Sequence, residues 1–309
     1  MIRLGTRRSP LALAQAGAVG DALRAAGLEV AIVELVTTGD RDRAAPDKAK
    51  WTGELERALV AEQIDLAVHS AKDVPAALAA DTALLGCPRR AATADVLIGA
   101  PTLEDLPRGA RIGTASLRRA AQLRAARRDV EVVEIRGNVD TRIARLADAG
   151  AARLDAIVLA AAGLERLGRA PEPAVALTGP TFVPAPGQGV VALQGRTGDP
   201  EAAAAAALVH DAETGRCLTA ERALARALGA DCTSAVGAHA TRVPGGEALR
   251  LRGFVGTPDG GDWAVDQRDG DDPEALGALL AQRLRAAGAD DILAASFEQA
   301  PAPLREAAE

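Results

Sequence analysis

The sequence has few aromatic residues and few lysines. Phe, Trp and Tyr together make up 2% of the 309 residues, and Tyr is absent. Ala, Leu and Val must therefore fill the hydrophobic cores. Lysine occurs only at Lys48, Lys50 and Lys72, and Arg supplies every other basic side chain. This rarity draws attention to Lys72.

Several classes of protein are disfavoured by what is missing. The cysteines Cys87, Cys217 and Cys232 are an odd, widely spaced set, which is neither a disulfide framework nor a zinc motif. No apolar run reaches the ~18 residues of a membrane span, and no secretory cleavage pattern follows the first residues. The net charge of −6 argues against general nucleic-acid binding. We therefore expect a soluble cytoplasmic protein with no metal, no membrane partner and no nucleic-acid partner.

Two long stretches alternate short apolar runs with helical patterns, which predicts α/β units with mostly parallel strands and crossover helices. In residues 1–88, Ser9 and Pro10 are expected to cap and begin a helix that stops at Gly27. The apolar segment VVALQ after Gly189 is expected to return to the first sheet, so that two lobes form a hinged cleft. Other strands are expected at 2–5, 29–36, 66–68, 96–99, 111–113, 130–135 and 156–159, and other helices at 52–62 and 117–126.

The chain changes character after about residue 210. A helix is expected at 220–228 and another at 273–287, with strands at 248–255 and 263–267. The turn DGGD between these two strands suggests an antiparallel pair. This region predicts a small α+β module.

The stretch LAVHSAKDVP, residues 66–75, is the first candidate site. Its apolar start reads as a buried strand, which then ends in His69, Ser70, Lys72 and Asp73. Open α/β sheets place their ligands beyond the carboxyl ends of such strands. The pair Lys72 and Asp73 is therefore a functional candidate, and His69 reads as a structural neighbour. The alternative is a solvated turn whose charges have no role.

Arginines recur where an expected strand becomes a helix. Helix N-termini carry free N–H groups and a positive dipole end, and Arg binds carboxylates bidentately. Three such junctions predict a site for a ligand with several carboxylates or phosphates, although any single Arg could instead be solvated or ion-paired. An Asp in such a site would handle a proton or stabilise a cation. The arginines are Arg7, Arg8, Arg118, Arg119, Arg136 and Arg142.

Two further segments each allow a functional and a structural interpretation. Cys232 lies in the small-residue loop ADCTSAVG, without the neighbouring base of a catalytic thiolate. It is either a covalent anchor or a buried structural cysteine. The segment GQG, residues 187–189, is either a phosphate loop or a tight crossing between domains.

Seven stretches together resemble the porphobilinogen deaminase family, also called hydroxymethylbilane synthase, over essentially the full length of the chain. They are GTRRSPLALAQA (5–16), DLAVHSAKDVP (65–75), IGTASLRRAAQL (112–123), EIRGNVDTRIARL (134–146), AIVLAAAGLERLG (156–168), PAPGQGVVAL (184–193) and TAERALARALGADC (219–232).

The resemblance implies an α/β fold with two periplasmic-binding-protein-like domains around a hinged cleft and a small C-terminal α+β domain. The implied domains are 1–90 plus 188–208, 91–187, and 209–309. The family joins four porphobilinogen units head to tail into hydroxymethylbilane and releases ammonia at each step. Growth starts on a covalent dipyrromethane cofactor. The resemblance also implies a monomer.

Roles carry over by the same resemblance. Asp73 aligns with the catalytic Asp, and Cys232 with the Cys whose thioether holds the cofactor. The implied active-site loop contains Lys48 and Trp51. Further cofactor-binding positions are Lys72, Ser116, Arg118, Arg119 and Arg142, and the implied substrate-binding positions are Arg7, Ser9, Arg136, Arg142 and Arg166.

The chain departs from the family pattern at two places. The active-site loop reads PDKAKW where the family has a glycine-rich run, which restricts its backbone freedom. Asp231 precedes Cys232 and disfavours its thiolate. An inactive family member is one rival hypothesis. A carboxylate receptor with two hinged lobes is the other, although it would have no use for Asp73 or an anchoring cysteine.

Overall fold

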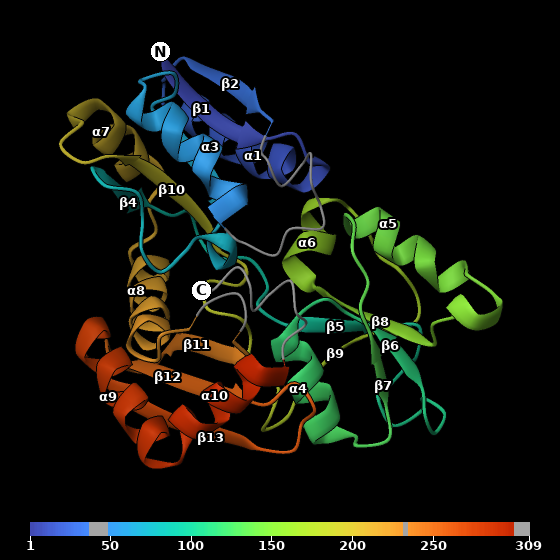
Figure 1. Ribbon diagram of the computed structural model, residues 1–309. Coiled ribbons are helices and arrows are strands. Elements are labelled where there is room, and N and C mark those ends of the chain that lie inside the picture. Colours follow the sequence, from blue (N-terminus) through green and yellow to red (C-terminus); the bar gives the residue numbers. More distant parts are fainter. Residues whose placement is uncertain (37–48, 231–233, 300–309) are drawn as a thin grey trace.

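The computed structural model describes residues 1–36, 49–230 and 234–299, whose strands form three sheets (Figure 1). Two sheets have five strands each and carry helices, and the third has three antiparallel strands. The expected fold class, two α/β units followed by a small α+β unit, is confirmed. Among the described residues, none of the helices combines the length and the apolar character that a membrane span requires.

The first sheet has the strand order β2-β1-β3-β10-β4. Strand β1 runs parallel to β2 and β3, whereas β10 runs antiparallel to β3 and β4. The return of VVALQ to this sheet is confirmed, but the sheet is mixed rather than mostly parallel because that strand enters between β3 and β4 from the opposite end. Its elements are β1 (Ile2–Arg7), α1 (Pro10–Ala25), β2 (Val30–Leu35), α3 (Ala49–Val60), β3 (Leu66–Ser70), the 3-10 turn η1 (Ala71–Asp73), β4 (Thr82–Gly86), β10 (Val191–Arg196) and α7 (Pro200–Val209).

The second sheet, β7-β6-β8-β5-β9, repeats this arrangement. Strand β6 is parallel to β7 and β8, and β5 is antiparallel to β8 and β9. Its elements are β5 (Asp95–Ile98), β6 (Arg111–Gly113), α4 (Leu117–Ala126), β7 (Glu131–Val133), α5 (Val139–Ala144), η2 (Arg145–Ala147), η3 (Gly150–Ala152), β8 (Ala156–Ala160), α6 (Ala161–Arg166) and β9 (Ala174–Ala176).

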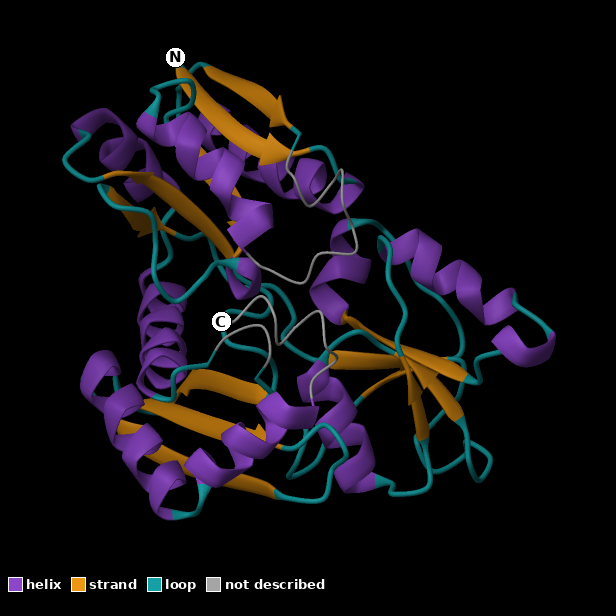
Figure 2. Ribbon diagram, in the orientation of Figure 1, coloured by secondary structure: helices purple, strands orange, loops and turns teal. Residues whose placement is uncertain are grey.

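The third unit packs its helices against an antiparallel sheet (Figure 2). Helix α8 begins at Ala212, eight residues earlier than the sequence predicted, because the Asp211 carboxylate caps it by accepting from Thr214 N at 2.8 Å. Figure 1 shows α8 lying between the first unit and the third sheet. The elements are α8 (Ala212–Ala227), β11 (Val236–Arg242), β12 (Leu249–Gly256), β13 (Trp263–Gly270), α9 (Pro273–Ala286) and α10 (Ala289–Gln299).

Each unit has its own apolar core, built largely from Leu, Ile, Val and Ala. Leu4, Leu66 and Leu193 from three neighbouring strands meet α1 in the first unit, and Ile112 and Val158 lie at the centre of the second. These cores hold the strands in register, so the positions at which strands end are fixed. The side chains that follow those strand ends are consequently held in place.

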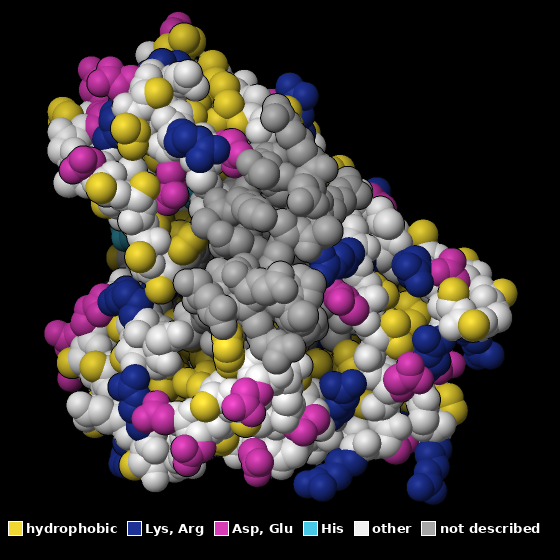
Figure 3. All heavy atoms as spheres, viewed as in Figure 1, with side chains coloured by type: hydrophobic (Ala, Val, Ile, Leu, Met, Phe, Trp, Pro, Cys, Tyr) yellow, Lys and Arg dark blue, Asp and Glu magenta, His cyan; other side chains and the backbone are white. Residues whose placement is uncertain are grey.

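The exposed arginines are mostly paired with carboxylates. Arg250 contacts Asp269 at 2.7 Å, and Arg169 contacts Asp140 at 2.6 Å. On the face drawn in Figure 3, basic and acidic side chains are interspersed over all three units. Exposed pairs of this kind contribute little to stability. The arginines that are buried are therefore the ones considered below as candidate site residues.

Candidate active site

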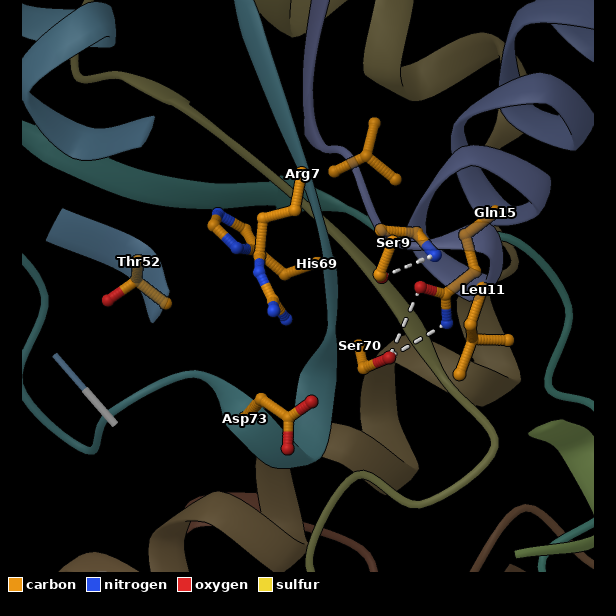
Figure 4. A pocket seen from close by; sticks show the side chains of 10 residues that line it. Arg7, Ser9, Leu11, Gln15, Thr52, His69, Ser70 and Asp73 are labelled. Atoms are coloured by element: carbon orange, nitrogen blue, oxygen red, sulfur yellow. Dashed lines mark hydrogen bonds between the residues drawn. The ribbon is translucent and has the colours of Figure 1, made fainter. Parts of the chain in front are cut away.

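A cavity of about 60 Å³ lies where β1 and β3 end and α1 begins. Because β1 and β3 are parallel neighbours, their carboxyl ends meet at one edge of the sheet. Figure 4 shows the Arg7 side chain extending from β1 toward Asp73, which follows β3 in the turn η1. The cavity is lined by Arg7, Ser9, Leu11, Ala12, Gln15, Thr52, Val68, His69, Ser70 and Asp73.

Polar contacts fix one wall of the cavity. Gln15 Nε2 donates to Ser70 Oγ at 2.8 Å, which ties α1 to the end of β3. Ser9 caps α1, as predicted, by accepting from Ala12 N at 3.3 Å. The helix N-terminus, with its positive dipole end, therefore faces the same space as the Arg7 side chain.

The opposite wall contains two buried polar atoms that have no partner among the described residues. They are Thr52 Oγ1 and His69 Nε2. Burial lowers the pKa of His69 to about 4, so its imidazole is neutral near pH 7. The nearby charges of Glu56 and Asp73 act to raise that pKa, but burial dominates.

Cationic side chains from both α/β units surround Asp73. Burial lowers the pKa of Lys72 to about 8, and the charge of Arg119 on α4 lowers it further, whereas Asp73 acts to raise it. Burial also lowers the pKa of Arg142 on α5, with Arg119 acting in the same direction and Asp73 against it. The structure thus brings Lys72, Asp73, Arg119 and Arg142 together from two different sheets.

Arg118 and Arg119 are both held by Asp95, which the sequence analysis missed. Asp95 Oδ2 accepts from Arg118 Nη1 at 2.7 Å, and Oδ1 accepts from Arg119 Nε at 2.9 Å. Burial would raise the pKa of Asp95, but the charges of Arg118 and Arg119 hold it well below its usual range. Arg118 Nη1 also donates to Val183 O at 2.9 Å. Asp95 therefore fixes both guanidinium groups in a buried site.

The two chain segments that connect the first and second units are also held in place, by hydrogen bonds and by close packing. Gln188 Nε2 donates to Thr93 O at 2.7 Å and to Asp95 Oδ1 at 3.0 Å, linking the outgoing and returning segments. Gly189 has φ +85°, and a Cβ there would lie 2.6 Å from Ala91 O. The GQG segment thus lies at a close approach of two backbones.

The other predicted site residues lie at the edges of this region. Arg166 Nη2 donates to Gly189 O at 2.8 Å, between the second unit and the crossing. Ser116 caps α4 by accepting from Arg119 N at 3.4 Å. Arg136 is exposed, and its Nε donates to Glu134 Oε1 at 2.6 Å.

Three predicted positions fall outside what the structure describes. Lys48 and Cys232 lie in segments 37–48 and 231–233, outside the described residues, and the side chain of Trp51 is likewise not described. Their roles stay predictions.

Glu221 and Arg222 on α8 are further residues that the sequence analysis did not single out. Glu221 is fully buried; it accepts from Arg90 Nη1 at 2.6 Å, Gly187 N at 2.7 Å and Ala240 N at 2.8 Å. Arg222 Nη2 donates to Pro75 O at 2.8 Å, in the loop after the catalytic candidate. Charged residues on a helix usually face solvent, so no sequence signal marked them.

The arrangement fits a ligand with several carboxylates next to a centre of positive charge. Partly desolvated Lys72, Arg119 and Arg142 are suited to binding anions. Of the two carboxylates near them, Asp95 is engaged by Arg118 and Arg119, and Asp73 is suited to a cation or a proton. In the described parts of the chain, no cluster of three or more His, Cys, Asp or Glu side chains could hold a metal ion.

Comparison with known proteins identifies the family of this chain. A sequence model described as "Porphobilinogen deaminase, dipyromethane cofactor binding domain" matches residues 2–204, and one for the C-terminal domain of porphobilinogen deaminase matches residues 216–286. A porphobilinogen deaminase of Roseiflexus castenholzii is 44% identical over 95% of this chain and 98% of its own length. One from Rubrobacter xylanophilus is 46% identical over 94% of this chain and 95% of its own length.

Among solved structures, the methionine binding protein MetQ is 14% identical over 69% of this chain and 91% of its own, with a TM-score of 0.45. A nutrient binding protein from Burkholderia cenocepacia, bound to methionine, has a TM-score of 0.44 at 14% identity, over 69% of this chain and 93% of its own. The full-length sequence matches decide the assignment. The chain belongs to the porphobilinogen deaminase family.

Proposed function

We propose that the site around Asp73 carries out the porphobilinogen deaminase (hydroxymethylbilane synthase) reaction of the chain's family, with Asp73 as the catalytic residue. In this reaction four porphobilinogen units are joined head to tail and ammonia leaves at each step. The observation that carries the proposal is that the Asp73 carboxylate acts on the buried cations Lys72 and Arg142, whereas the neighbouring Asp95 is engaged by Arg118 and Arg119.

The cations bind the side chains of the substrate and of the growing chain. Each porphobilinogen carries an acetate and a propionate, so every unit brings two negative charges into the cleft. Hydrogen bonds between a guanidinium and a carboxylate are among the strongest in proteins, and more so where water is excluded. We assign Arg7, Ser9, Arg136, Arg142 and Arg166 to the substrate, and Lys72, Ser116, Arg118, Arg119 and Arg142 to the cofactor.

Asp73 acts on charge and protons at the reacting carbon. Loss of ammonia from the aminomethyl group leaves a cationic, azafulvene-like pyrrole, which a nearby carboxylate stabilises. After coupling, the pyrrole carbon that has formed the new bond must lose a proton, and we assign its acceptance to Asp73. Arg222 donates to the backbone carbonyls of the loop that follows Asp73, which helps to fix the position of Asp73.

The dipyrromethane cofactor, attached to Cys232, supplies the pyrrole carbon on which growth starts. The basic side chains Lys72, Arg119 and Arg142 suit its carboxylates. Burial raises the pKa of Cys87 to about 12 and that of Cys217 to about 11, so neither thiol is readily ionised. These values argue against Cys87 and Cys217 as the anchor, and the alignment with the family's cysteine supports Cys232.

The test is the intact mass of the purified protein. We expect a mass increase equal to two deaminated porphobilinogen units, absent in Cys232→Ser. Asp73→Asn should keep that cofactor mass but lose at least ~100-fold in turnover. The matched control Asp81→Asn, in an exposed turn of the same unit, should be fully active. Near-normal turnover in Asp73→Asn would remove it from the mechanism.

The wider organisation is part of the same proposal. We assign domains to residues 1–90 plus 188–208, 91–187, and 209–309, which agrees with the strands that each sheet takes. The enzyme is proposed to be a cytoplasmic monomer. Sedimentation of the cofactor-loaded protein at one chain per particle would support this, and a stable dimer would contradict it.

A further inference from the structure

One face of α8, in the third unit, lies against residues 71–76, which we call the Asp73 turn (Figure 1). Three side chains on this face are spaced by three and four positions, so they are neighbours on the helix surface. They are Leu218, Glu221 and Arg222. Each of them contacts the Asp73 turn, or the segment packed against it, in a different way.

The first two of these side chains hold the start of the turn. Leu218 is buried in one apolar cluster with Ala71. Glu221 accepts from Gly187 N at 2.7 Å. Gly187 lies so close to the turn that a Cβ on it would be 2.9 Å from Ala71 Cβ. The main chain two residues before Asp73 is therefore packed between α8 and the segment that α8 binds.

Arg222 holds the end of the turn. Its Nη1 donates to Val74 O at 3.3 Å. Its Nη2 donates to Pro75 O at 2.8 Å and to Ala76 O at 3.2 Å. These three residues lie between η1 and β4, outside any helix or strand, so the contacts with the guanidinium replace the backbone pairing of a regular element. Asp73 directly precedes them and is thus held from both sides.

The chemistry of a guanidinium suits this task. Its donors lie in one plane at fixed angles, so successive carbonyls that accept from it have little freedom to rotate. Burial lowers the pKa of Arg222, and the charge of Arg226 acts in the same direction, but a guanidinium stays protonated near pH 7. Hydrogen bonds from a charged donor are stronger than those between neutral groups. Both terminal nitrogens of Arg222 donate to the loop, so its role is to position the main chain.

We propose that α8 is the template of the Asp73 turn, and that Arg222 is the positioning residue through which the third unit sets the turnover rate. This inference rests on the proposed function. Asp73 belongs to the first unit, whereas the guanidinium that fixes the loop after it belongs to the third. The catalytic carboxylate is therefore in place only when the third unit is docked on the first.

A displaced Asp73 carboxylate should slow the chemical step and leave substrate binding nearly unchanged. Asp73 is assigned to the cation and the proton, whereas arginines of the two α/β units are assigned to the substrate carboxylates. A misplacement of about 1 Å costs roughly 100-fold in rate. An interaction that matters only in the transition state changes kcat, and one that binds substrate uniformly changes KM. The positioning role thus predicts an effect on kcat alone.

The experiment compares two arginines of α8. Arg222→Met removes the guanidinium and keeps an apolar stem. The matched control is Arg216→Met, because Arg216 also donates to two backbone carbonyls, those of Glu247 at 2.8 Å and Asp271 at 2.9 Å, but both lie in the third unit. Each variant is loaded with cofactor, which intact mass verifies. We then measure kcat and KM for porphobilinogen well below the thermal midpoint of each protein.

We expect Arg222→Met to lower kcat by about tenfold to 100-fold with KM within about twofold of the unaltered enzyme. Arg222→Lys should lose only about threefold to tenfold, because an ammonium keeps the charge but reaches only part of the three carbonyls. Arg216→Met should keep kcat within about twofold, because its lost contacts do not touch the Asp73 turn.

A double-mutant cycle with Asp73→Asn separates positioning from a general structural role. If Arg222 acts through Asp73, adding Arg222→Met to Asp73→Asn should lower kcat by less than about threefold more. If Arg222 only stabilises the protein, the two losses should multiply, because a structural effect does not depend on the carboxylate at position 73.

Several results would overturn the positioning role. They are losses that multiply in the cycle, a raised KM with unchanged kcat, and an equal loss of kcat in Arg216→Met. If Arg222→Met does not fold, the cycle is run with Arg222→Lys, and unaltered kcat in that variant would overturn the role as well. Absence of the cofactor mass in the unaltered protein, or normal turnover in Asp73→Asn alone, would instead contradict the proposed function.

Discussion

Asp95→Asn should remove the counter-charge of two buried arginines while keeping the shape of the side chain. Arg118 and Arg119 are 4% and 6% exposed, and Asp95 itself is 5% exposed. Removing one partner of a buried ion pair typically costs about 3–5 kcal/mol, because the remaining charge stays desolvated. We expect the free energy of unfolding to fall by that amount near pH 7.

The control for this variant is Asp155→Asn. Asp155 immediately precedes β8. Its carboxylate accepts from Arg111 N at 2.8 Å, and its ionic partner, 3.4 Å away, is the exposed Arg153. Exposed pairs contribute about 0–1 kcal/mol, so this control should lose only ~1 kcal/mol with its one backbone hydrogen bond. The difference between the two variants isolates the buried charge.

The pH dependence gives a second measurement on the same pair. The pKa of Asp95 is lower in the folded protein than the ordinary 3.8, so the folded state binds fewer protons in that range. The stabilisation from the ionised Asp95 carboxylate is complete above pH ~4 and is lost as the pH falls through the folded-state pKa. Urea unfolding should show a constant gap between wild type and Asp95→Asn from pH 5 to 7. A loss under ~1 kcal/mol, or one equal to Asp155→Asn, would refute the reasoning.

Two more predictions concern the contacts that join the units. Glu221→Gln should lower the free energy of unfolding by about 3–5 kcal/mol, since Gln cannot accept from all the donors around Glu221, Arg90 among them; a urea midpoint within error of wild type would contradict this. Gly189→Ala should be strongly destabilising because its Cβ would meet Ala91 O at 2.6 Å, whereas Gly198→Ala, at φ +81° in open space, should lose only about 1–2 kcal/mol. Equal thermal shifts in the two glycine variants would show that the close approach does not matter.

Local signals in the sequence predicted local structure well. The Ser9–Pro10 start of α1 and the bounds of β6 and α4 agree with the structure because capping and apolar periodicity are short-range effects. The early start of α8 was missed because Gly215 lowers helix propensity. In the folded chain, a Cβ at that position would lie 2.5 Å from the His210 ring, so packing selects glycine there.

The candidate site could be predicted only where its residues follow strand ends. Asp73, Lys72 and Arg7 met this condition, and the structure brings Asp73 and Arg7 to one cavity. Asp95 contacts arginines more than 20 positions away, and Glu221 contacts Arg90 from another unit. Nothing in the neighbouring sequence marks such partners, because long-range pairing depends on how whole sheets are placed.

The position of β10 affects the order in which the units of the protein can fold during synthesis. This strand lies between β3 and β4, with Leu193 opposite Val68. Strand β4 therefore has no neighbour in its sheet until residues 191–196 leave the ribosome. The strands of the second sheet all lie between Asp95 and Ala176, so that sheet can close earlier although its sequence begins later. We expect the N-terminal unit to mature last, and truncation before Val191 to leave a folded middle unit attached to an unfolded beginning.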